Sequence, residues 1–102
     1  MSDLAFKPIE STVVLDVSAC HCLGELHAVL KEGFGLPDYY GENWDALWDC
    51  LDDRFCEERE FLVEIHGFAQ LPRDLAEGCA GLWDVFDEIA ATHQNVTFKR
   101  VS

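Results

Sequence analysis

The strongest constraint on the fold is the alternation of short strand-forming runs with longer stretches of helical spacing. Residues 13–17, 61–65 and 95–101 are apolar or β-branched runs of strand length, and such runs predict strands. The stretches between them carry apolar residues every three or four positions, which is typical of amphipathic helices. Strands that alternate with helices pair in parallel through right-handed crossovers. The pattern therefore predicts an α/β fold with a small parallel sheet.

Three helices are predicted between these runs. The first covers about residues 23–34 and ends where glycines and Pro37 follow, because neither residue type continues a helix well. The second covers about residues 44–53, with Asn43 as its N-cap. The third is predicted as a single helix of about 18 residues. Its apolar positions, at alternating steps of four and three, are Leu75, Cys79, Leu82, Phe86 and Ile89.

The length of 102 residues predicts one domain. Residues 12–102 hold every predicted element and are assigned to that domain, whereas residues 1–11 lack periodicity and are predicted to be a loose N-terminal extension. Hydrophobic residues make up 49% of the chain. That content supports a core and argues against a disordered chain, whatever its charge.

The cellular compartment is predicted from missing signals and from the cysteines. No run of about 18 apolar residues is present, so no transmembrane helix is expected. Residues 1–10 lack the basic-then-apolar pattern of a signal peptide. Five cysteines without such a signal predict reduced thiols in the cytoplasm. Among them, Cys22, Cys50 and Cys79 are predicted to be small core residues.

The net charge of −13 restricts the classes of partner. Binding to nucleic acid or to an anionic membrane requires a basic face, so neither is expected. Residues 38–60 hold nine acidic and two basic side chains, a net charge of −7 within 23 residues. An acidic region of this kind favours a basic partner, which it attracts from a distance.

The second predicted helix carries part of this charge as a stripe. Asp45, Asp49 and Asp53 recur every four residues, with Asp52 beside them. Like charges at this spacing destabilise a helix, and a local rule broken without compensation suggests a function. The alternative interpretation is a solvated acidic face with no partner.

Aromatic residues border this stripe. Tyr39 and Tyr40 precede the helix, and Trp44 and Trp48 lie on it. Aromatic side chains around charged groups are typical of binding hot spots. Trp44 is predicted to pack in the core, whereas Trp48 fits a core or an interface position.

The segment that carries these residues, LPDYYGENWDALWDCL at residues 36–51, resembles the signature segment of the barstar family, intracellular inhibitors of bacterial ribonucleases. A weaker similarity covers most of residues 13–102, with an apparent two-residue insertion within residues 52–60. The resemblance implies a two-layer α/β fold in which a three-stranded parallel sheet packs with helices.

The resemblance also implies roles for individual residues. Asp49 matches the family's central acid, which occupies the site of a substrate phosphate, and Asp45 matches an acid that pairs with nearby bases. Tyr39 matches an aromatic that packs over the ribonuclease active site. Asp52, Asp53 and Arg54 stand where the family has small and aromatic contact residues. The predicted partner-binding residues are Tyr39, Asn43, Asp45, Trp48, Asp49, Asp52, Asp53 and Glu88.

The sequence thus predicts a cytoplasmic, non-enzymatic inhibitor of a basic extracellular-type ribonuclease or nuclease toxin. It is expected to be a monomer, to bind its partner 1:1, and to need no cofactor or metal. One alternative is an acidic mimic of nucleic acid that binds another basic protein. A hydrolase that binds Mg²⁺ or Ca²⁺ is another, although the acidic spacing matches no Ca²⁺ loop. Cys20 and Cys22 are too close together for a usual zinc site, and no catalytic triad can be assembled around His27 or His66.

Overall fold

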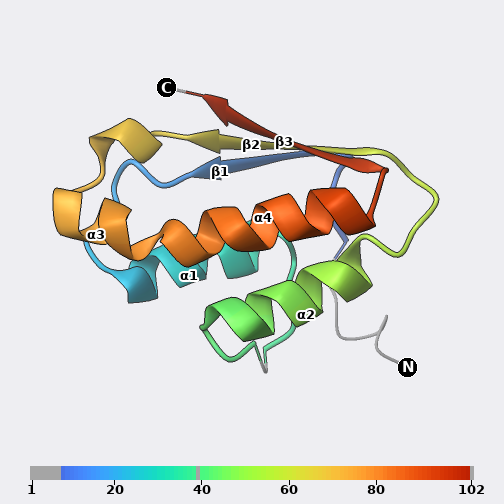
Figure 1. Cartoon of the computed structure of the whole chain (residues 1–102), viewed down its shortest axis with the longest axis horizontal. Coiled ribbons are helices and arrows are strands. Elements are labelled where there is room, and N and C mark those ends of the chain that lie inside the picture. The colour runs from blue at the N-terminus through green and yellow to red at the C-terminus, as the bar shows by residue number, and fades with distance from the viewer. Residues whose placement is uncertain (1–7, 39, 102) are drawn as a thin grey trace.

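A computed structural model describes residues 8–38 and 40–101 of the chain. Three strands, β1 (Thr12–Asp16), β2 (Phe61–His66) and β3 (Val96–Val101), form a parallel sheet in the order β1-β2-β3 (Figure 1). Each strand lies next to the one that follows it in the chain. The predicted α/β fold with a three-stranded parallel sheet is therefore confirmed.

The helices lie on one side of the sheet (Figure 1). Helix α1 (Leu23–Gly33) packs against β1, and α4 (Ala80–Thr92) packs against β3. Helix α2 (Trp44–Arg54) packs against α4, on the side away from the sheet. This outer position leaves one face of α2 available to solvent.

The core fills the space between the sheet and the helices. On β1, Val13 and Leu15 point inward while the residues between them are exposed, as the two-residue period of a strand requires. The ring of Phe86 on α4 stacks on Phe98 of β3, with 4.3 Å between the ring centroids. Phe55, which ends α2, contacts Phe34 edge to face and so ties α2 into the same core.

The prediction of one long helix between β2 and β3 is wrong. After a short 3₁₀ turn at Phe68–Gln70, the chain forms two helices, α3 (Arg73–Gly78) and α4, which are separated at Cys79. The apolar spacing continues across the break because both helices bury their apolar residues in the core, Leu75 from α3 and Leu82 from α4. Spacing alone therefore suggested one helix. Gly78, a weak helix former, ends α3 immediately before the buried Cys79.

The prediction for one cysteine is also wrong. Cys50 and Cys79 are buried as expected, but Cys22 is exposed and Cys20 is buried in its place. Cys22 is the N-cap of α1 and has an extended backbone, so it precedes the first turn that packs on the core. All five cysteines are free thiols.

The predicted N-terminal extension, residues 1–11, is described only at residues 8–11. There the side chain of Ile9 is half-buried against the core. Within the part of the chain that the structure describes, no helix has the length and apolar character needed to span a membrane.

Candidate functional site

The candidate site begins at the N-terminus of α2, where the backbone is tightly specified. Asn43 is the N-cap, as predicted: its Oδ1 accepts a hydrogen bond from the Ala46 N–H at 2.8 Å. Its Nδ2 donates to the Gly41 carbonyl at 3.2 Å. Glu42, between them, has a φ of 52°, in the left-handed region that few non-glycine residues adopt. Such strained residues are held by their surroundings and gather at functional sites.

The acidic stripe lies on the solvent side of α2. Asp45, Asp49 and Asp53 are exposed, and among the described residues none of them forms an ion pair or hydrogen bond through its carboxylate. Asp45 in the first turn is favoured by the helix dipole, whereas Asp53 near the C-terminus is not. The stripe is therefore available to a cationic partner.

Asp52 differs from its three neighbours. Its Oδ1 accepts a hydrogen bond at 2.7 Å from Nε2 of His93, the residue that caps the C-terminus of α4. The Asp52 side chain is 37% exposed and that of His93 is 12% exposed. The structure thus ties this predicted site residue to α4, through a contact between residues 41 positions apart that the sequence did not predict.

The two tryptophans of α2 have different environments. Trp44 lies between His27 of α1, with 4.8 Å between ring centroids, and the backbone of Gly81 on α4. It is half-buried and packs three helices together. Trp48 is also half-buried against the core. Its buried indole Nε1 has no hydrogen-bond partner among the described residues.

A buried polar pair supports the loop before α2. His27 is 4% exposed, and its Nδ1 forms a hydrogen bond with the Tyr40 hydroxyl at 2.6 Å. Burial lowers the pKa of His27 and raises the pKa of Tyr40 above its usual range, so both groups are neutral in the fold at neutral pH. The pair anchors the loop to α1. A contact between residues 13 positions apart has no sequence signature, so the sequence did not predict it.

Glu88 is presented by α4 beside α2. The two helices run in the same direction, because Trp44 meets Gly81 at one end and Asp52 meets His93 at the other (Figure 1). Glu88 is seven residues after Gly81, so it lies on the same face of α4. It is exposed, and its place in the sequence between Gly81 and His93 puts it opposite the middle of α2.

Tyr39, a predicted contact, lies outside the described residues. Arg54, in the last turn of α2, is only 7% exposed, and its burial lowers the pKa of its guanidinium. The cation in the last turn of the acidic helix is therefore shielded from solvent.

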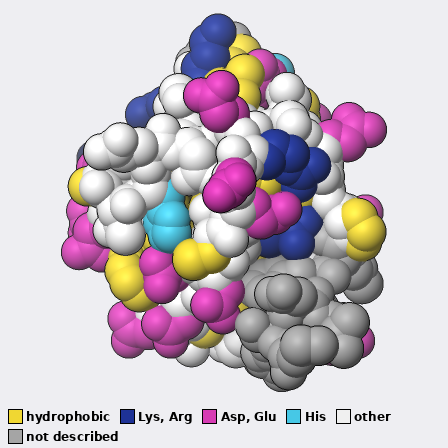
Figure 2. Space-filling view, turned by 90° about the vertical axis from the view of Figure 1, so that its right-hand side faces the viewer, with side chains coloured by type: hydrophobic (Ala, Val, Ile, Leu, Met, Phe, Trp, Pro, Cys, Tyr) yellow, Lys and Arg dark blue, Asp and Glu magenta, His cyan; other side chains and the backbone are white. Residues whose placement is uncertain are grey.

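The surface around the ends of α2 and α4 carries charges of both signs. In Figure 2, acidic side chains are spread over the lower left, whereas Lys and Arg gather right of the centre. Among the described residues, no group of three or more His, Cys, Asp or Glu side chains has an arrangement that could hold a metal ion.

Comparison with known proteins agrees with this architecture. The chain is 46% identical over 39 residues to a Bacillus subtilis (strain 168) protein named "Putative ribonuclease inhibitor YrdF". The aligned segment covers 38% of this chain and 43% of that protein, less than half of either. The family described as Barstar (barnase inhibitor) matches residues 10–101. The chain therefore belongs to the barstar family.

Proposed function

We propose that this protein inhibits a basic ribonuclease by filling its active site with the acidic face of α2. The observation that carries the proposal is the row of exposed carboxylates at Asp45, Asp49 and Asp53, which no described residue neutralises. Membership of a family described as barnase inhibitors supports the same partner class.

The chemistry of a ribonuclease explains why such a face would bind. The enzyme must hold a phosphodiester with cationic and hydrogen-bonding groups, so its active site is an electropositive cleft. Asp49, in the middle of a rigid helix, would occupy the place of the phosphate through charge-assisted hydrogen bonds. Asp45 would pair with a neighbouring base, and Glu88 would reach the rim of the cleft. The inhibitor would catalyse no reaction itself.

This proposal includes a biological setting. A cell that makes a secreted or toxic ribonuclease must protect its own RNA, so the inhibitor would act in the cytoplasm as an immunity protein. One inhibitor would bind one enzyme, because each nuclease offers one active-site cleft. Tyr39, Asn43 and Trp48 would complete the contact around the carboxylates.

The test is inhibition of a basic secreted bacterial ribonuclease by the purified protein and two variants. Asp49→Ala should weaken inhibition by about 10- to 100-fold, since a hydrogen bond between charged groups contributes about 1.5–3 kcal/mol. Asp74→Ala is the matched control, because Asp74 is an exposed acid on α3. If both variants inhibit as well as the wild type, the plugging mechanism is wrong. Equal weakening by both would favour diffuse mimicry of nucleic acid.

A further inference from the structure

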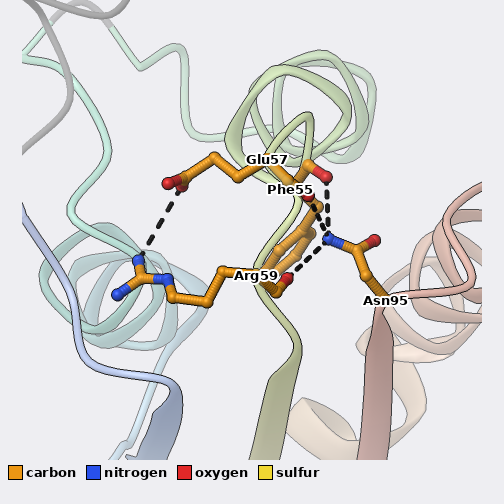
Figure 3. A network of polar contacts seen from close by, with 4 residues as sticks. All are labelled: Phe55, Glu57, Arg59 and Asn95. Atoms are coloured by element: carbon orange, nitrogen blue, oxygen red, sulfur yellow. Dashed lines mark hydrogen bonds and ion pairs between the residues drawn. The ribbon is translucent and has the colours of Figure 1, made fainter.

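The turn between α4 and β3 forms hydrogen bonds with the loop that follows α2, residues 55–60. The Nδ2 of Asn95 lies within hydrogen-bond distance of three backbone carbonyls, those of Phe55 at 3.1 Å, Glu57 at 2.8 Å and Arg59 at 2.9 Å (Figure 3). The carbonyl of Asn95 accepts a hydrogen bond from the Phe61 N–H at 2.6 Å. One side chain thus fixes the path of the whole loop.

His93, two residues earlier, holds the last turn of α2. Its Nε2 donates to Asp52, and its own N–H donates to the Ile89 carbonyl at 2.8 Å. The side chains of His93 and Asn95 thus bind residues that lie 36 to 41 positions earlier in the sequence. The turn at residues 93–95 therefore joins the C-terminal ends of α2 and α4.

Among the described residues, few other contacts order the loop, and one of them is the hydrogen bond that the Cys56 N–H donates to the Asp53 carbonyl at 3.3 Å. Residues 56–60 are all exposed, and exposed loops with few packed contacts open easily. Within the loop, Arg59 lies over the Phe61 ring at 4.6 Å and pairs with Glu57 at 3.8 Å. Both are surface interactions of small energy.

Asn95 binds the loop through main-chain carbonyls, so the tether does not depend on the side chains of the loop. Every residue has a carbonyl, so the side chains at positions 56–60 can differ without loss of the tether. They remain exposed beside the acidic stripe of α2. A surface whose backbone is held and whose side chains are unconstrained is suited to specifying a partner.

We propose that His93 and Asn95 are positioning residues for the inhibitor. They hold the end of α2 and the loop at residues 55–60 beside α4, so that these segments are already ordered when the ribonuclease binds. The inference rests on the proposed function for its partner. Preorganisation of this kind raises affinity because the inhibitor loses less conformational entropy when it binds.

The experiment measures loop order and inhibition in the same variants. In the free protein, Asn95→Ala should speed hydrogen exchange of the amides at residues 56–60 by about 10-fold, and it should weaken inhibition by a similar factor, about one hydrogen bond's contribution. Asn95→Asp keeps the shape but has no donor, and should fail to restore either property. Gln94→Ala, in the exposed middle of the turn, should change neither.

A second control distinguishes the positioning role of Asn95 from a general loss of stability. Val63→Ala removes a methyl pair from the centre of the sheet, where Val63 is fully buried, and should lower global stability while inhibition by the folded protein is retained. Equal loss of inhibition in Val63→Ala, or unchanged exchange at residues 56–60 in Asn95→Ala, would overturn the proposal.

Two further outcomes remain informative. If Asn95→Ala does not fold, His93→Gln replaces it, and the proposal then requires faster exchange at Arg54 and Phe55. If the wild-type protein inhibits no ribonuclease, the proposed function fails. The exchange measurements would still decide whether the turn orders the loop.

Discussion

A single added methyl group should report how closely α2 and α4 pack. A Cβ at Gly81 would overlap the Trp44 ring, lying 2.6 Å from Nε1 and 2.8 Å from Cγ, besides a closer approach to Cδ1. A Cβ at Gly78 would meet only the Leu23 methyls, at 3.9 Å, which is ordinary contact. Both glycines are helical, and neither has a positive φ. They form a matched pair that differs in the space available.

The expected magnitudes follow from two opposing effects. Replacing Gly by Ala in a helix contributes up to about 1 kcal/mol of stability, whereas overpacking costs about 1–3 kcal/mol. Gly78→Ala should therefore raise the free energy of unfolding by up to about 1 kcal/mol. Gly81→Ala should lower it by up to about 2 kcal/mol, the difference between these two effects. For a domain of this size, 1 kcal/mol corresponds to about 4–8 °C in Tm.

Urea unfolding followed by tryptophan fluorescence and circular dichroism would measure both variants. In the Trp44→Leu background, Gly81→Ala should no longer destabilise the protein, since the smaller side chain gives the new methyl room. The coupling between the two positions would then exceed about 0.5 kcal/mol, as for residues in contact. Equal stabilisation by Gly81→Ala and Gly78→Ala would refute the close packing of Trp44 on α4.

Three further predictions concern the buried pair and the acidic face. Tyr40→Phe should lower the free energy of unfolding by about 1–3 kcal/mol, because buried His27 loses its hydrogen-bond partner; an unchanged thermal midpoint at pH 8 would contradict this. Burial lowers the pKa of His27 from its ordinary value of 6.5, so the unfolded chain takes up a proton first. The contribution of neutral His27 to the free energy of unfolding should be complete above pH 6.5 and should decline as the pH falls toward the lower folded-state pKa. A His27→Gln variant should lack this part of the pH dependence. Raising salt from about 10 to about 300 mM should slow association with the ribonuclease far more than it speeds dissociation, because screening acts on long-range attraction; a constant on-rate in stopped-flow would disprove steering.

The local elements could be predicted because their signals are local. The strands were recognised from β-branched runs, and the start of α2 from Asn43, whose side chain satisfies a backbone N–H three residues ahead. The stripe of Asp45, Asp49 and Asp53 follows from helical periodicity alone, and its exposure was expected on an amphipathic helix. The alternation of strands with helices predicted the parallel sheet, and the family resemblance implied the same two-layer fold.

Other features depend on contacts between distant segments. The separation of α3 from α4 at Cys79 leaves the apolar period intact, so periodicity could not reveal it. The pairing of His27 with Tyr40 needs α1 and the loop before α2 to meet in the core. The burial of Arg54 likewise reflects where the helix end lies. None of these features produces a pattern among residues that are neighbours in the sequence.

The order of the residues along the chain is enough to specify an acidic, aromatic-bordered helix on a small parallel α/β domain. Helical period, capping and charge depend on residues within a few positions of one another, so they can be deduced from the sequence alone. How that helix is held depends on long-range packing. Trp44 packs against Gly81 at one end, and the turn at residues 93–95 binds Asp52 and the following loop at the other. These contacts depend on the packing of helices against one sheet, which brings together residues up to 41 positions apart.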